Sequence, residues 1–140
     1  MGTFNEIRRL PEFEKEFVKL SKKRFRTLPE DLEVLMNTAL EAYHKLNQDY
    51  GGIVQISDLG ITYPEIYKVT KFACKSLKGR GAASGIRLTY AYFRDKDTIE
   101  FIEIYFKGDK ENEDRERIKE HYKKQDRFDK TMPKTFRAKC

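Results

Sequence analysis

The stretch from Ile66 to Tyr105 limits most strongly what this chain can fold into, because it reads as three β-strands. Apolar or aromatic residues alternate with polar ones over residues 66–72, 85–93 and 98–106, which is the period-two pattern of half-buried strands. Turn-forming residues at 94–97 join the last two strands. The pattern therefore predicts an antiparallel three-stranded unit.

Strand alternation also predicts which side chains share a face of this sheet. In the middle strand it places Arg87 on the face opposite Leu88. In the last strand, unbroken alternation places Glu103 and Tyr105 on the same face as Phe101. The apolar set of the middle strand is expected to be buried, so Arg87 is expected to emerge beside the cations of the neighbouring strand.

The segment from Ile66 to Tyr90 carries cations and no Asp or Glu at all. The whole chain has 29 Lys and Arg against 23 Asp and Glu, a net charge of +6. Such a balance is compatible with nucleic acid as a partner, and the clustering strengthens the case. Residues 73–84 read either as a phosphate-binding loop or as a mobile loop kept soluble by its charges. The cations of the segment are Lys68, Lys71, Lys75, Lys78, Arg80 and Arg87.

Two amphipathic helices are expected before the strands, over residues 12–24 and 29–47. Pro11 fits the first turn of the first helix, and residues 5–10 and 53–56 are possible short strands. The second helix has one continuous apolar face, made of Leu32, Leu35, Met36, Ala39, Leu40, Tyr43 and Leu46. The expected fold is α+β: an N-terminal two-helix hairpin packed on a small, mainly antiparallel β-sheet.

The C-terminal part has a weaker pattern. Residues 111–124 alternate acids and bases at helical spacing with only Ile118 and Tyr122 as apolar anchors, which predicts a marginal, largely solvated helix. Residues 125–140 lack periodicity and are expected to form a flexible tail. The chain is therefore expected to comprise one domain, residues 1–124, followed by that tail.

Several classes of protein are excluded by what the sequence lacks. There is no apolar run of the roughly 18 residues that a membrane span needs, and no membrane partner is expected. No Cys–His cluster or nucleotide-binding fingerprint occurs, so neither a metal nor a cofactor is expected. Two cysteines, Cys74 and Cys140, and the lack of an apolar N-terminal segment favour a cytoplasmic protein with free thiols.

Four segments resemble the RelE-like toxins of type II toxin–antitoxin systems, in the RelE/ParE superfamily. PEFEKEFVKL is similar to the family's entry into the first helix, and IYKVTKF to its Tyr-Lys-(apolar)-Lys strand. SGIRLTYAY resembles the Gly-(Tyr/Ile)-Arg-(apolar)-(apolar)-Tyr strand, which is the most specific match. IEFIEIYFKGDK resembles the last strand and its basic turn. The resemblance covers residues 5–122.

This resemblance implies an endoribonuclease that cuts mRNA in the ribosomal A site without a metal. The ribose 2′-hydroxyl would attack the adjacent phosphate and leave a 2′,3′-cyclic phosphate. By position Arg87 matches the phosphate-stabilising arginine of the family, and Lys68 matches the first lysine of its basic strand. The family's end-of-sheet arginine has no direct match here, so Lys107, Lys110 or Tyr122 would take that role.

The same resemblance implies three partners: mRNA, the ribosome and a cognate antitoxin protein. Lys71, Lys75, Lys78 and Arg80 are expected to bind RNA. Two alternatives stay open at this point. One is a ParE-like protein that inhibits DNA gyrase, and the other is an RNA-binding protein that keeps the fold without cleavage.

Overall fold

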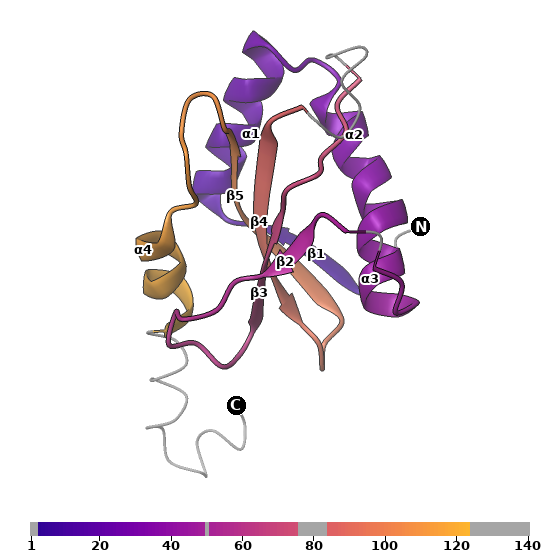
Figure 1. Cartoon of the computed structure of the whole chain (residues 1–140), viewed down its shortest axis with the longest axis vertical. Coiled ribbons are helices and arrows are strands. Elements are labelled where there is room, and N and C mark those ends of the chain that lie inside the picture. The colour runs from indigo at the N-terminus through magenta and orange to yellow at the C-terminus, as the bar shows by residue number, and fades with distance from the viewer. Residues whose placement is uncertain (1–2, 50, 76–83, 124–140) are drawn as a thin grey trace.

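A five-stranded mixed sheet forms the centre of the molecule, in the order β1-β5-β4-β3-β2 (Figure 1). The computed structural model describes residues 3–49, 51–75 and 84–123. The expected tail and the cations Lys78 and Arg80 lie outside these ranges. The strands are β1 (Glu6–Arg9), β2 (Ile53–Gln55), β3 (Glu65–Val69), β4 (Ile86–Phe93) and β5 (Thr98–Phe106).

The sheet confirms the α+β class and the three strands predicted between residues 66 and 106. Strands β2, β3, β4 and β5 pair antiparallel in succession. The N-terminal strand β1 pairs with β5 in parallel, from Glu6 opposite Thr98 to Arg9 opposite Phe101. The sheet is therefore mixed. Strand β1 lies at its edge, next to β5, and runs parallel to β5, whereas the other neighbouring strands are antiparallel.

Helix α1 begins and ends where its sequence predicts. Pro11 occupies the first turn, Glu12 lies near the positive N-terminal end, and Lys22 and Lys23 lie near the negative C-terminal end. The second helical segment is longer and includes a π-helical turn at Met36–Leu40. The α-helices are α1 (Pro11–Lys23), α2 (Leu28–Leu35), α3 (Glu41–Lys45) and α4 (Arg115–Ile118).

Both N-terminal helical segments cover the same face of the sheet. The ring of Phe13 on α1 stacks on Phe101 at 5.2 Å, and Tyr43 on α3 meets Tyr67 edge-on at 5.6 Å. The register places Tyr67, Tyr90 and Phe101 in one row across β3, β4 and β5. Helix α1 packs mainly against β5 and makes a smaller contact with α2. Each helical segment thus packs directly on the sheet, and the predicted two-helix hairpin is not confirmed.

His44 belongs to this core, although polar residues flank it in the sequence. Its Nε2 lies 2.7 Å from the Tyr90 hydroxyl, and its ring meets that of Tyr67 edge-on at 4.8 Å. Burial lowers the pKa of His44 to about 4, with a smaller effect in the same direction from the positive charge of Arg94. The histidine is therefore neutral at physiological pH and acts as an aromatic core residue.

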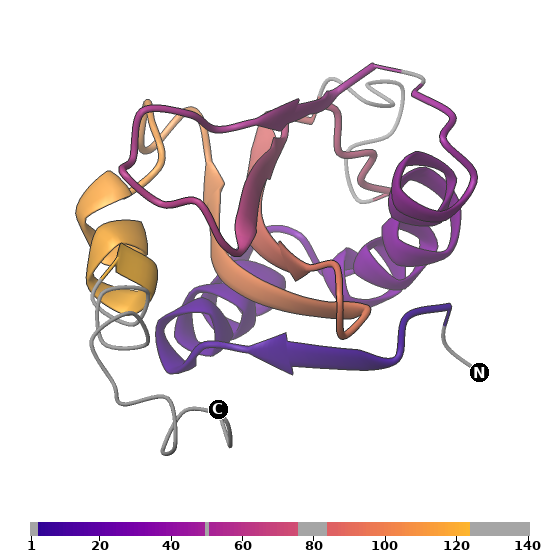
Figure 2. The same cartoon turned by 90° about the horizontal axis from the view of Figure 1, so that it is seen from below.

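The opposite face of the sheet is covered by α4 and the π-helical turn that follows it, Lys119–Lys123 (Figure 2). Ile118 is 0% exposed and Tyr122 is 1% exposed, which confirms them as the apolar anchors, while the other residues of the segment are exposed or half-buried. The Tyr122 ring packs against Phe93 with the ring centres 6.3 Å apart. Two well-placed apolar anchors are enough to dock the segment because the sheet supplies a complementary apolar surface.

A β-bulge in β5 overturns the predicted faces of its second half. Thr89 lies opposite Glu103 and Tyr90 lies opposite Phe101, so Ile102 is an extra residue. Before the bulge, Phe101 faces the helices. After it, Glu103 and Tyr105 face the α4 side instead.

Among the described residues, no helix is long and apolar enough to cross a membrane.

Docking of α4 can be tested by truncating its anchor. Ile118→Ala should lower the free energy of unfolding by about 2–5 kcal/mol, because it removes a fully buried side chain and leaves a cavity. Urea denaturation measures the effect. Glu120→Ala, at an exposed position of the same segment, is the control and should stay within about 0.5 kcal/mol of the wild type. Equal stabilities for the two variants would contradict the docked arrangement.

Candidate functional site

The candidate site lies on the α4 side of the sheet, where polar residues from three strands form two adjacent rows. Lys68 on β3 lies opposite Thr89 on β4, and Thr89 lies opposite Glu103 on β5. In the next row Arg87 lies opposite Tyr105. Residues two apart on a strand face the same side, so Arg87 and Lys68 are diagonal neighbours, as the sequence predicts.

Arg87 is half-buried, and it makes no ion pair within the part of the chain that the structure describes. Its Nη1 only approaches the carbonyl oxygen of Ile86, at 3.4 Å. A guanidinium presents donors in a planar fork that matches two oxygens of one anion. Arg87 therefore retains its capacity to bind a phosphate.

Tyr105 is the cross-strand partner of Arg87 and has a buried hydroxyl without a hydrogen-bond partner among the described residues. Burial raises the pKa of Tyr105 to about 12, and the carboxylates of Glu113 and Glu103 add to the shift, while Arg87 opposes it. The phenol is therefore protonated at neutral pH. A buried polar atom that lacks a partner calls for an explanation.

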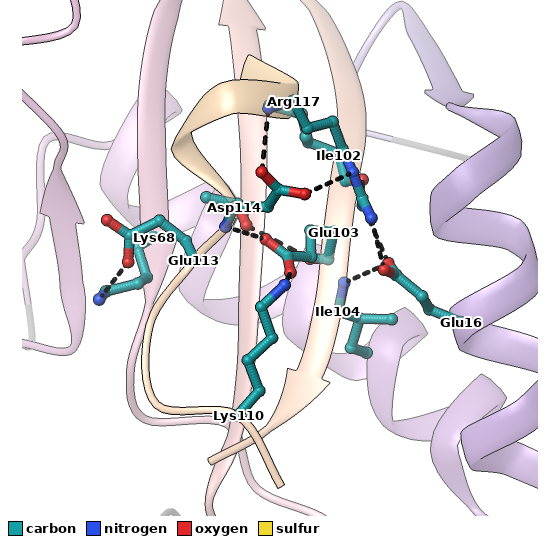
Figure 3. A network of polar contacts seen from close by, with 10 residues as sticks. Glu16, Lys68, Ile102, Glu103, Ile104, Lys110, Glu113, Asp114 and Arg117 are labelled. Carbon is teal, nitrogen blue, oxygen red and sulfur yellow. Dashed lines mark hydrogen bonds and ion pairs between the residues drawn. The ribbon is translucent and has the colours of Figure 1, made fainter. Parts of the chain in front are cut away.

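Glu103 lies at the centre of the site with no exposed side-chain surface (Figure 3). One carboxylate oxygen accepts a hydrogen bond from the backbone N–H of Asp114 at 2.7 Å, and the other forms an ion pair with Lys110. The charge of a buried carboxylate must be compensated in this way, since isolation from water is costly. Glu103 therefore fixes the start of the C-terminal segment against the sheet.

Glu113 covers the other end of the same row. Its Oε1 lies 2.8 Å from Nζ of Lys68, and its Oε2 lies 3.1 Å from Arg115. The side chains of Lys68 and Glu113 are 22% and 8% exposed. Burial, the largest single effect, would raise the pKa of Glu113, but the hydrogen bonds from Lys68, Arg115 and the backbone together with the charge of Lys68 outweigh it, and the pKa is lowered.

Arg117 on α4 connects this segment to the outer edge of β5 (Figure 3). It donates to the carboxylate of Glu16 at 2.7 and 3.1 Å and to the carbonyl oxygen of Ile102 at 2.8 Å. Glu16 in turn accepts from the backbone N–H of Ile104 at 3.2 Å. These contacts fasten α4, α1 and β5 to one another beyond the point where β1 ends.

A groove of about 540 Å³ runs between α1 and the second half of β5. Tyr105, Glu103 and Lys110 line it on the sheet side, and Lys19 and Lys23 line it on the helix side. The lining of the groove is mainly apolar, and its charged residues are of both signs, because Glu16 and Asp109 accompany the lysines.

The remaining predicted site residues are not gathered with Arg87. Lys107 is exposed in the turn after β5, and Tyr122 is buried with its hydroxyl donating to Glu100 at 2.6 Å. Lys71 and Lys75 line a different pocket, next to α2 on the helix side. The structure therefore brings together Lys68, Arg87 and Lys110, and places the others elsewhere.

Three residues of the site were not identified from the sequence: Glu103, Tyr105 and Glu113. Glu103 had a signal, because an acid flanked on both sides by apolar residues of a strand needs a partner. Tyr105 had none, since only the bulge turns it toward Arg87. Glu113 looked like one of many surface acids, and only the docking of α4 brings it to Lys68.

In the described ranges, no group of three or more His, Cys, Asp or Glu residues is placed to hold a metal ion.

Comparisons with known proteins give two similar structures. No protein family model matches the sequence, and no curated protein sequence matches it. A chain of the archaeal RelE–RelB complex from Pyrococcus horikoshii OT3 has a TM-score of 0.44 at 12% identity, covering 74% of this chain and 94% of that one. A free-state double arginine-to-alanine mutant of the E. coli toxin RelE has a TM-score of 0.40 at 19% identity, covering 79% and 90%. The two structures are of a RelE–RelB complex and of a RelE toxin, and RelE-like toxins are the family that the sequence resembles.

The role of Glu103 can be tested by removing its carboxylate. Glu103→Ala leaves the Asp114 N–H and the Lys110 ammonium without their acceptor, so it should lower the free energy of unfolding by about 1–3 kcal/mol. It should also speed hydrogen exchange at the Asp114 amide. Glu111→Ala, at an exposed position on the same segment, is the matched control. If Asp114 exchanges at the same rate in both variants, Glu103 does not hold the segment.

Proposed function

We propose that this protein is a RelE-type toxin, a ribosome-dependent endoribonuclease that cuts mRNA and is neutralised by an antitoxin. The observation that carries the proposal is the placement of Arg87, Lys68 and Tyr105 on one face of the sheet. Cations set side by side on a sheet repel one another, and an anion between them turns this repulsion into attraction. A phosphate of RNA is such an anion.

The proposed reaction is transesterification within the RNA strand. The 2′-hydroxyl gives its proton to solvent water as its oxygen forms a bond to phosphorus, and the bond from phosphorus to the 5′-oxygen breaks, which leaves a 2′,3′-cyclic phosphate and a 5′-hydroxyl. Negative charge grows on the non-bridging oxygens in the transition state, where Arg87 and Lys68 are placed to stabilise it. The leaving 5′-oxygen needs a proton, and the protonated hydroxyl of Tyr105 is the proposed donor.

Two of the cations in the site are already matched by carboxylates, and this favours a second candidate function. Lys68 is paired with Glu113 and Lys110 with Glu103. A protein of this kind would bind RNA without cutting it if only Arg87 contacted the phosphate. The two functions differ in one measurable way, the appearance of a cyclic phosphate product. Inhibition of DNA gyrase is the third outcome, and a supercoiling assay detects it.

The proposed partners follow from the same reasoning. The similar archaeal structure is a RelE–RelB complex, and we expect this chain to be held by a cognate antitoxin in the same way. Such a partner must neutralise the cationic surface, so acidic side chains are expected where it meets the site.

Arg87 is the residue on which the proposed cleavage most depends. Arg87→Ala should reduce mRNA cleavage by roughly a hundred- to a thousandfold, equivalent to about 2.7–4 kcal/mol, because a cation is lost from the transition state. Arg87→Lys should recover only part of the rate, since an ammonium cannot hold two phosphate oxygens at once. Induced expression in bacteria, with growth, translation and mRNA 5′ ends followed together, measures the effect.

Thermal melting of the same variants separates catalysis from folding. Arg94→Ala is the control, because Arg94 lies exposed in the turn between β4 and β5 and pairs with Glu65 away from the site. It should leave growth arrest unchanged. Full toxicity of Arg87→Ala would sink the assignment of Arg87, and toxicity without mRNA cleavage would exclude the ribonuclease.

A further inference from the structure

The Glu113 carboxylate lies where the proposed function requires a phosphate. It contacts Lys68 at 2.8 Å, and its charge raises the pKa of Tyr105, the cross-strand partner of Arg87, more than the charge of Glu103 does. A carboxylate and a phosphate both present oxygens that carry negative charge, and the Lys ammonium binds either group as a point charge. The site therefore contains, in the free protein, an anion of its own.

We propose that Glu113 occupies the phosphate position at Lys68 in the free protein, so that RNA gains its contact with Lys68 only by displacing the Glu113 side chain. This inference rests on the proposed binding of RNA, and it adds an internal competitor to that site. The competitor is a feature of the C-terminal segment, which covers the sheet from Lys110 to Tyr122.

The segment is anchored on both sides of Glu113, independently of Lys68. Before it, Lys110 pairs with the buried Glu103, and directly after it the Asp114 N–H donates to Glu103. Further on, Arg117 pairs with Glu16 and Ile118 is fully buried. Glu113 is thus tethered over Lys68 at a high effective concentration, even when its own contact is broken.

The position of Glu113 also makes the exchange with RNA feasible. The anchors hold the backbone, so the carboxylate can leave Lys68 by rotating its side chain without undocking α4. Its second oxygen already contacts Arg115, which is 40% exposed and can keep the displaced carboxylate paired near solvent. Arg87 has no competing acid in the described ranges, so it offers an incoming phosphate its first contact before Lys68 is released.

The expected consequence is weaker binding of RNA by the free protein than its cations alone would allow. Only the fraction of molecules with Lys68 released binds fully, and the apparent dissociation constant rises in inverse proportion to that fraction. If the released form makes up about a tenth of the population, neutralising Glu113 tightens binding about tenfold.

Binding of a short fluorescent RNA by the full chain tests the competition. The RNA carries 2′-O-methyl groups, so it cannot be cut, and fluorescence anisotropy gives its dissociation constant. Glu113→Gln keeps the shape of the side chain and removes its charge, and it should tighten binding about tenfold. Glu116→Gln removes the same charge from a side chain that is 87% exposed on the same segment, and it should change binding less than about twofold.

A second substitution locates the effect at Lys68. In a Lys68→Met background, Glu113→Gln should change RNA affinity no more than Glu116→Gln does, because there is no ammonium left to release. A tenfold effect that persists without Lys68 would overturn the proposed exchange. Equal affinities of Glu113→Gln and Glu116→Gln, or no binding of RNA by either, would overturn it as well.

A measurement on the wild-type protein guards against misfolding of the variants. When RNA takes Lys68, the Glu113 carboxylate loses a hydrogen bond and leaves its nearly buried position, so the chemical shift of its carboxyl carbon should change. Carbon NMR of the glutamate carboxyl groups, with and without RNA, detects that change. A Glu113 carboxyl signal that saturating RNA leaves unchanged contradicts the exchange, whatever the variants do.

Failure of this inference and failure of the proposed function give different results. A toxic protein that cuts mRNA, but in which Glu113→Gln and Glu116→Gln bind RNA alike, keeps the function and loses the competitor. A protein that binds RNA more tightly after Glu113→Gln, but never cuts mRNA or arrests growth, keeps the competitor and loses the cleavage.

Discussion

The buried carboxylate of Glu103 is the interaction on which the rest of the candidate site depends. It has no exposed surface, and its charge is compensated by Lys110 and by the Asp114 N–H. Both partners come from the segment that follows β5. The charge of Glu103 is therefore compensated only when that segment is docked on the sheet. Because the bulge at Ile102 turns Glu103 toward the α4 side, a single extra residue in β5 decides where the C-terminal segment binds.

The distribution of charge along the sequence differs from its distribution in space. The run from Ile66 to Tyr90 has no acid, which reads as an exposed cationic surface. In the folded chain, acids from a later segment reach this surface, and Glu113 neutralises Lys68 there. Arg87 keeps its charge unpaired among the described residues. The cationic character of the site is therefore concentrated on one guanidinium rather than spread over a basic strand.

Local pattern predicted the elements of this fold well, and it failed where distant segments meet. The two N-terminal helical regions, the strands of the 66–106 unit and the face of Arg87 follow from periodicity, which depends on neighbours in sequence. The parallel pairing of β1 with β5 does not, since nothing near Glu6 specifies Thr98. Docking of α4 was not predicted, because two apolar side chains, Ile118 and Tyr122, are few for a helix. How much they stabilise docking depends on the sheet surface on which they pack. Tyr105 was assigned to the wrong face because the bulge has no signature in the alternation around it.

The contacts of Arg117 have a consequence for the chain during its synthesis. Strand β1 covers β5 only as far as Phe101, and beyond it the outer edge is closed by Glu16 and Arg117, which lie 101 residues apart. An open strand edge is a template for pairing with another chain. Until Arg117 has left the ribosome, the nascent chain contains every strand of its sheet. Glu16 is already present at that stage, but without Arg117 the outer edge of β5 stays open. Protection of this edge against aggregation therefore comes after every strand in the order of translation, and a chain truncated before α4 would expose that edge permanently.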